Sequence, residues 1–128
     1  MSKPCVWIDA TNSTSGIIVW GMTIVERQIR EFSLLGIESF KVFLCDDELH
    51  RIGELREDFS RLYSAEITWV SVPNIQDFWT AVGEANESLI LVAGDAIYDD
   101  RVFSHVLKDG PGVIICTESR AVCYLNAG

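Results

Sequence analysis

Short apolar runs alternate with stretches of helical periodicity along this chain. The runs at residues 5–8, 40–45, 66–72 and 89–93 have the length and apolar character of buried strands. Residues 23–35, 48–63 and 75–87 between them repeat apolar side chains at helical spacing. Strands buried on both faces are typical of parallel sheets with crossover helices. The pattern predicts one α/β domain over residues 1–128, a three-layer Rossmann-like, mainly parallel sheet with helices on both faces.

The ends of the first predicted helix carry recognisable signals. Thr23 is a good N-cap residue, and Glu26 lies at capping-box spacing from it. Gly36 is suited to end the helix. The pair Asp46-Asp47 suits the positive N-terminal end of the second helix. On the third helix, Phe78, Trp79 and Val82 are expected to form the apolar stripe.

The remaining segments are shorter. Residues 17–20 are expected to form a strand or a packed loop, and residues 102–107 a short helix. Residues 108–112 contain Gly and Pro and predict a turn. Residues 113–116 and 121–125 predict two strands that form an antiparallel addition to the sheet.

Composition narrows the class of partner. The chain has 128 residues, of which 48% are hydrophobic and 23% charged, as expected for one globular domain. Its net charge is −9 and its ten cations are scattered, which argues against nucleic acid as a partner. A nucleotide or phosphorylated small molecule would be held through backbone amides, a helix N-terminus or a metal ion.

The four cysteines indicate a reducing compartment. Cys5, Cys45, Cys116 and Cys123 each lie in an apolar strand-like run, and none forms a CxxC pair. We expect reduced, buried thiols that bind no metal, which points to a cytoplasmic chain; a zinc site is the alternative. The N-terminal apolar stretch is too short for a signal peptide, and no run approaches membrane-spanning length.

The most informative motif is the apolar run that ends in Gly94-Asp95. A buried strand with a carboxylate at its C-terminal tip is how open α/β sheets build ligand and metal sites. A carboxylate suits Mg²⁺, which takes oxygen ligands and keeps waters for substrate phosphates. Asp95 is therefore the candidate metal ligand, expected near Asp9 or the loop after the first strand. The alternative is that Asp95 only turns the chain or caps residues 99–107.

That loop supplies a second set of polar groups. Thr11, Asn12, Ser13 and Thr14 offer hydroxyls, an amide and backbone N–H groups at the edge where such sheets bind ligands. They are the candidate nucleotide-binding residues. The alternative is a polar turn that satisfies its own hydrogen bonds.

Three segments in order resemble the front half of the sugar-nucleotide and cytidylyl nucleotidyltransferases, nearest to the inositol-phosphate cytidylyltransferase type. They are residues 5–10 with the polar loop, residues 21–37 with the strand at 40–44, and the strand that ends in Gly94-Asp95. The resemblance implies a Rossmann-like transferase fold in which Asp95 holds Mg²⁺ beside nucleotide phosphates.

The chain departs from that family in its first loop. The family's loop is Gly-rich and carries a basic residue, whereas here it has one glycine, Gly16, and no Lys or Arg occurs between Lys3 and Arg27. The family's second half is also missing. We expect a degenerate or truncated module, a nucleotide- or partner-binding accessory domain without catalysis of its own. The alternative is a Mg²⁺-dependent nucleotidyltransferase whose site is completed by missing sequence, a fused or partner domain, or a homo-oligomer.

A third hypothesis is an unrelated Rossmann-like enzyme that uses the acids at its strand tips. Asp9 and Asp46-Asp47 also follow predicted strands. Ser13 or Ser15 as a nucleophile would need a base, and the sequence places neither His50 nor His105 for that role. Trp79 and Trp20 are candidates for an interface.

Overall fold

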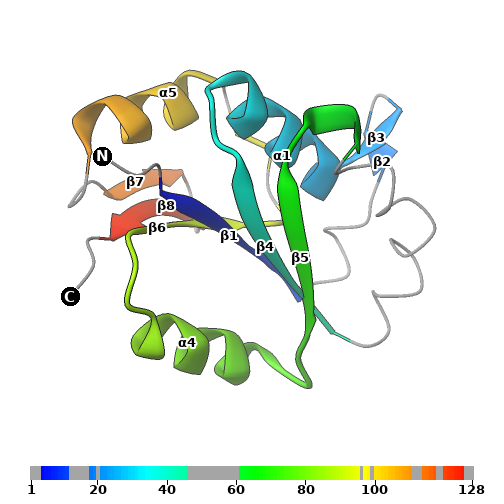
Figure 1. Ribbon diagram of the computed structural model, residues 1–128, viewed down its shortest axis with the longest axis vertical. Helices are drawn as coiled ribbons and strands as arrows, with labels where there is room; N and C mark the ends of the chain where they lie inside the picture. Colours follow the sequence, from blue (N-terminus) through cyan, green and yellow to red (C-terminus); the bar gives the residue numbers. More distant parts are fainter. Residues whose placement is uncertain are drawn as a thin grey trace.

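A six-stranded sheet with helices on both faces forms the molecule (Figure 1). The computed structural model describes residues 4–11, 18–19, 21–45, 61–95, 97–98, 100–110, 114–117 and 120–125. The strand order is β5-β4-β1-β6-β8-β7. The predicted three-layer, Rossmann-like architecture is confirmed.

Four neighbouring strands of the sheet are parallel, from β5 at one edge inward: β5 (Glu66–Ser71), β4 (Ser39–Leu44), β1 (Cys5–Ala10) and β6 (Leu89–Ala93). The predicted antiparallel addition is also present, since β8 (Arg120–Leu125) pairs with β6, and β7 (Ile114–Thr117) pairs with β8. β1 runs two residues beyond the predicted end at Ile8, because its pairing with β4 continues to Ala10.

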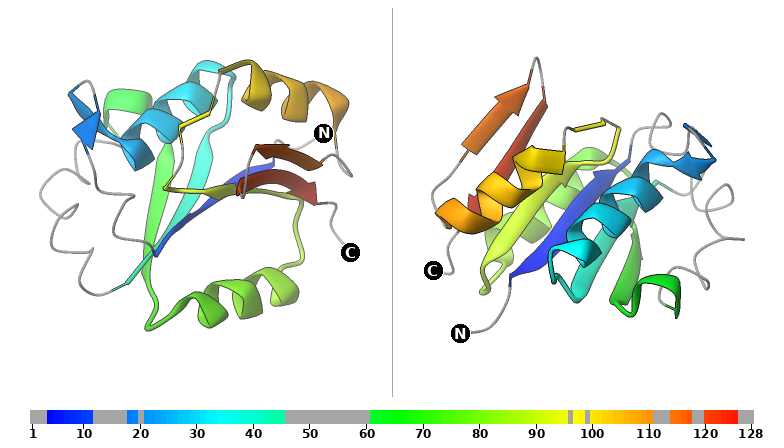
Figure 2. Two further views of the ribbon diagram at one scale, coloured as in Figure 1. Left: turned by 180° about the vertical axis from the view of Figure 1, so that it is seen from behind. Right: turned by 90° about the horizontal axis from the view of Figure 1, so that it is seen from above.

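The helices divide unequally between the two faces. α1 (Ile24–Leu34) and α5 (Asp100–Asp109) lie side by side on one face, as Figure 2 shows. α4 (Ile75–Glu84) lies along the other face. A separate hairpin of β2 (Ile18–Val19) and β3 (Met22–Thr23) precedes α1. No helix in the described part of the chain is long and apolar enough to cross a bilayer.

Both ends of α1 match their sequence signals. The Thr23 Oγ1 accepts a hydrogen bond from the backbone N–H of Glu26 at 3.1 Å, as an N-cap does. At the other end, Gly36 has a φ of +95° and donates to the Ser33 carbonyl, while Ile37 donates to the Phe32 carbonyl. These two bonds form a Schellman motif, whose left-handed position favours glycine.

The other helices differ from prediction at their ends. α4 stops at Glu84, three residues before the predicted end at Glu87, because Ala85 is already extended on the way to β6. α5 runs from Asp100 to Asp109, so Lys108 is helical and not part of the predicted turn, which begins at Gly110 with a φ of +80°. Of the predicted helix at 48–63, only residues 61–63 are described, and they are helical.

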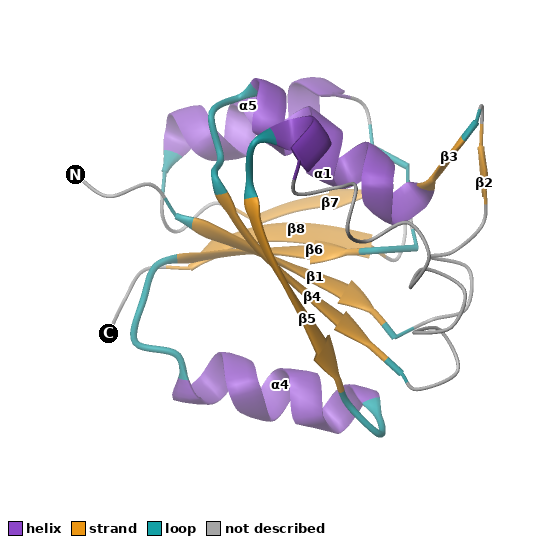
Figure 3. Cartoon of the chain, turned by 45° about the vertical axis from the view of Figure 1, so that its right-hand side comes forward, coloured by secondary structure: helices purple, strands orange, loops and turns teal. Residues whose placement is uncertain are grey.

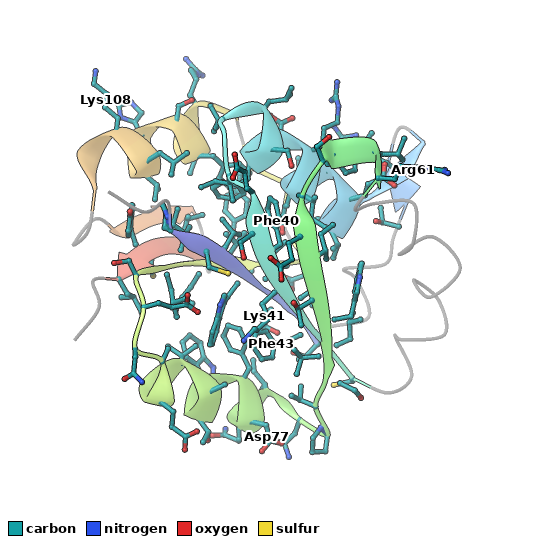
Figure 4. All side chains as sticks on the ribbon, in the orientation of Figure 1. Phe40, Lys41, Phe43, Arg61, Asp77 and Lys108 are labelled. Carbon is teal, nitrogen blue, oxygen red and sulfur yellow. The ribbon has the colours of Figure 1, made fainter. Side chains whose placement is uncertain are left out.

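Strand alternation divides the core into two layers. Phe40 packs on the α1 side of β4 and Phe43 on the α4 side, together with the half-buried Lys41 (Figure 4). On α4, Phe78 is 1% exposed and lies in the buried stripe, as predicted. Trp79 was predicted to lie in the same stripe, but it is 52% exposed, so that prediction is wrong. Consecutive residues lie about 100° apart around a helix, so both cannot face the sheet.

Candidate functional site

The carboxyl ends of β1 and β6 meet at the topological switch point of the sheet. From β1 the parallel strands continue through β4 and β5 in one direction and through β6 in the other. Open α/β sheets bind ligands outside the carboxyl ends of strands at such a point. α1 begins at this same edge, with the β2–β3 hairpin just before it (Figure 3).

Gly94 brings the two strand ends into close contact. Its N–H donates to the Asp9 carbonyl at 2.8 Å, which continues the β1–β6 pairing by one bond. A Cβ on residue 94 would lie 2.7 Å from that carbonyl oxygen and 2.9 Å from the Ile8 Cγ2. Only glycine allows β6 to end this close to β1, so the Gly94-Asp95 pair marks a real steric requirement.

The side chain of Asp9 is already oriented at this edge. Its Oδ1 accepts hydrogen bonds from the Thr11 backbone N–H at 3.1 Å and from the Thr11 Oγ1 at 2.6 Å. Both bonds fall on one oxygen, which leaves Oδ2 as the atom through which Asp9 can contact a ligand. Thr11 thus behaves here as a turn residue, the alternative that the sequence had left open for this loop.

Asp95 follows Gly94 directly and is half-buried. Because Ala93 pairs with Asp9, the two acids lie at neighbouring strand ends, as the sequence predicted for their placement. The role of Asp95 as a metal ligand stays a prediction. Within the described ranges, no three or more His, Cys, Asp or Glu residues gather as a metal site.

Several predicted site residues lie outside the described residues. They are Asn12, Ser13, Thr14, Ser15, Asp46, Asp47 and His50. His105 is described, and it is exposed on α5. Cys5, Cys45 and Cys123 form no disulfide. Cys5 is buried as predicted, but Cys45 and Cys123 are only half-buried, so the prediction of burial is wrong for these two. Burial is the main reason that the pKa of Cys5 is raised, so this thiol stays protonated and unreactive near neutral pH.

One residue that sequence reasoning missed is Gln28 on α1. Its side chain is 2% exposed within the apolar core, and its Nε2 donates to the Ala93 carbonyl at 2.8 Å. This bond ties α1 to the last residue of β6, just before Gly94-Asp95. A signal was present in the sequence, because Gln28 lies one turn from both Ile24 and Phe32, in phase with the buried stripe.

Two charged residues, Glu26 and Arg27, lie near the start of α1. The Tyr63 hydroxyl donates to the Glu26 Oε2 at 2.8 Å, which ties the start of α1 to the segment before β5. Burial, together with the carboxylate of Glu26, raises the pKa of Tyr63 to about 12. Arg27, half-buried beside Glu26, is the first cation after the polar loop, so α1 carries a positive charge near its N-terminus.

Comparison with known proteins supports the fold. No family model matches the chain, and no curated protein matches it. Among solved structures, 63 chains match, so the scaffold is shared widely and does not select a function by itself. One of them is 4-diphosphocytidyl-2C-methyl-D-erythritol synthase from Anaerococcus prevotii, with a TM-score of 0.55 and 14% identity.

That alignment covers 94% of this chain and 63% of the synthase chain. The present chain therefore spans less than two thirds of the length of this structural neighbour. At 14% identity the likeness concerns the fold alone. It agrees with the nucleotidyltransferase-like resemblance read from the order of the sequence segments, and the chain has a Rossmann-like fold of that general kind.

Proposed function

We propose that this chain is a nucleotide-binding module that uses the carboxyl ends of β1 and β6 and lacks catalytic activity of its own. The observation that carries the proposal is the contact between Gly94 and the Asp9 carbonyl. This contact keeps the ends of β1 and β6 together, so that two acidic residues, Asp9 and Asp95, lie at adjacent strand ends at the switch point of the sheet. Phosphates of a nucleotide would approach these acids together with a cation, since carboxylates alone repel them.

The donor set fits Mg²⁺. This ion is bound in proteins by one or two carboxylates and completes its shell with water and substrate phosphates. Asp95 and the Oδ2 of Asp9 are the residues that would hold it, while the Oδ1 of Asp9 stays bonded to Thr11. Bound there, the ion would neutralise phosphate charge. Because two carboxylates are a poor site without phosphates, we expect Mg²⁺ and nucleotide to bind together.

The lack of turnover follows from the polar loop. Nucleotidyl transfer needs positioned cations that neutralise the charge of the transition state. Residues 4–26 contain no Lys or Arg, and the loop has one glycine. The name of the structural neighbour describes a diphosphocytidyl compound as its product, which makes CTP the first nucleotide to test.

The test is a titration with CTP, ATP, GTP and UTP, each with and without Mg²⁺, followed by amide NMR shifts. We expect Mg²⁺-dependent shifts at Thr11, Gly94 and Asp95. Asp95→Asn should weaken the affinity by about tenfold or more, because an interaction with a charged group contributes about 1.5–3 kcal/mol. Asp77→Asn, which removes a half-buried acid from α4, is the matched control. Shifts spread evenly over the surface, or none at all, would refute nucleotide binding.

The alternative to a module without activity is an active Mg²⁺-dependent nucleotidyltransferase. The position of Arg27 near the N-terminus of α1 favours this alternative. It predicts release of pyrophosphate from CTP in the presence of sugar-phosphate or inositol-phosphate acceptors. We expect no release above background. Turnover that is lost in Asp95→Asn and kept in Asp77→Asn would establish the enzyme in place of the accessory module.

A further inference from the structure

Two arginines border the end of β6, although the polar loop of the candidate site contains no basic residue. They are Arg27, on α1, and Arg120, the first residue of β8. The two residues come from segments far apart in the sequence. Each is placed near the end of β6 by a different set of contacts.

The pairing of β8 with β6 places Arg120. The two strands run antiparallel and lie side by side, so β8 starts at the edge where β6 ends (Figure 3). The last register pair is Val92 with Val122. Two residues further toward this edge on each strand are Gly94 and Arg120. Because neighbouring strands are about 4.8 Å apart, the backbone of Arg120 lies beside the end of β6, close to the Gly94-Asp95 pair.

Helix geometry places Arg27. Its two neighbours fix the rotation of α1 on the sheet, since Glu26 bonds to Tyr63 and Gln28 bonds to the last carbonyl of β6. Side chains in a helix lean toward its N-terminus, so Arg27 leans toward the carboxyl edge of the sheet, where α1 begins. Arg27 is half-buried and its Nε is buried, which shows that the side chain lies against the protein.

These positive charges complement the proposed ligand. Guanidinium groups bind phosphate oxygens through paired, charge-assisted hydrogen bonds. A single Mg²⁺ ion does not neutralise a triphosphate, and Asp9 and Asp95 add negative charge at the same edge. Arginines on the elements that flank β6 would supply the remaining positive charge, which the polar loop does not carry.

We propose that Arg27 and Arg120 bind the phosphates of the nucleotide at the end of β6, in place of cations in the polar loop. The inference rests on the proposed nucleotide site and names the residues that contact its phosphates. It predicts that the phosphate chain contributes most of the affinity, and that inorganic tripolyphosphate binds at the same place.

The probes are CTP and inorganic tripolyphosphate, each titrated with Mg²⁺ by calorimetry. We expect the unmodified chain to bind both probes, and less tightly as salt increases. Arg27→Gln and Arg120→Gln should each weaken the binding of both probes by about tenfold or more, as loss of a charge-assisted hydrogen bond does. Arg27→Lys and Arg120→Lys keep the charge and should recover part of the affinity.

Two variants with the same change of charge are the matched controls. Arg30→Gln removes an exposed cation one turn further along α1, and Lys108→Gln removes one from the far end of α5 (Figure 4). Both should leave the affinities nearly unchanged. Urea unfolding of every variant measures its stability, so that a loss of binding is compared with any loss of folding.

Three results would overturn the inference. They are no binding of tripolyphosphate by the unmodified chain, unchanged affinity in either Arg27→Gln or Arg120→Gln, and an equal loss in the controls. Unchanged affinity with a lower urea midpoint would assign the arginine to ion pairs within the fold. If tripolyphosphate binds through the arginines and CTP does not bind, the nucleotide proposal fails and the phosphate site stands.

Discussion

At the scale of single residues, the carboxyl edge of the sheet depends on a few atoms. Gly94 is required because the Asp9 carbonyl lies where its side chain would be. Asp9 in turn is oriented by Thr11, which donates twice to one carboxylate oxygen. Each of these contacts fixes backbone next to Asp95, so the geometry of the candidate site is sensitive to changes of one or two atoms.

Gly94→Ala is expected to destabilise the fold by about 1–3 kcal/mol, the range for overpacking a tight site. The added methyl must displace the end of β6 from β1. Urea unfolding measures the effect, and Gly83→Ala, whose Cβ meets open space, is the control that should stabilise. A Gly94→Ala variant as stable as the original would show that the strand ends separate without cost.

The bond between Tyr63 and Glu26 predicts a pH dependence in the alkaline range. The pKa of Tyr63 is raised from 10 to about 12, so the folded state favours the protonated phenol. Its contribution to stability is complete below pH 10 and declines as the pH rises toward about 12. Tyrosinate absorbance of the folded protein should show a late step that Tyr63→Phe removes.

Glu26→Gln is the matched variant for this step. It keeps an oxygen that can accept the hydrogen bond and removes the negative charge, so the pKa of Tyr63 should fall toward its ordinary value. An identical titration in Glu26→Gln would mean that burial alone sets the pKa.

At the scale of elements, α1 links the parts of the site. It is capped by Thr23 at the carboxyl edge, bonded through Glu26 to the segment before β5, and bonded through Gln28 to the end of β6. These bonds orient its first two turns toward the strand ends, while the buried apolar residues further along hold it on the sheet. A movement of α1 would therefore move Gly94 and Asp95 with it.

Gln28→Leu tests this link. Leucine fits an apolar core, but the substitution takes the Gln28 donor away from the carbonyl of the half-buried Ala93, at a cost of about 1 kcal/mol. Part of that cost is offset because leucine gains from burial. We expect a modest loss of global stability and markedly faster hydrogen exchange at the Gly94 amide. Gln76→Leu, at an exposed position on α4, is the control, and equal exchange rates in the two variants would contradict the role of Gln28.

At the scale of the whole molecule, the two faces of the sheet differ. In the part of the chain that the structure describes, two helices cover one face and α4 covers the other. The face with two helices holds the larger apolar cluster, and its helix α1 begins at the candidate nucleotide site.

The reactivity of the cysteine thiols depends on this packing. The chain has four cysteines, and all four should react with a thiol reagent in denaturant without reductant. In the folded protein Cys5, which is 8% exposed and has a raised pKa, should react only as the protein unfolds. Fewer than four reactive thiols in denaturant would indicate a disulfide or a bound metal.

The sequence by itself determined the central sheet, its layers and the ends of α1. Apolar runs and helical periodicity indicate where strands and helices form, because both depend on residues that are close together along the chain. Thr23 and Gly36 mark the ends of α1 for the same reason. The sequence also identified Gly94-Asp95 as the tip of a strand at the carboxyl edge of the sheet.

The tertiary structure alone decided which groups meet at that edge. The Gly94 contact with Asp9, the Gln28 bond to Ala93 and the Tyr63 bond to Glu26 join residues 37 to 85 positions apart. Such contacts depend on strand order and register, which periodicity does not encode. The exposure of Trp79 was likewise decided by how α4 is rotated on the sheet, since the sequence shows an apolar stripe but not which of its edges is covered.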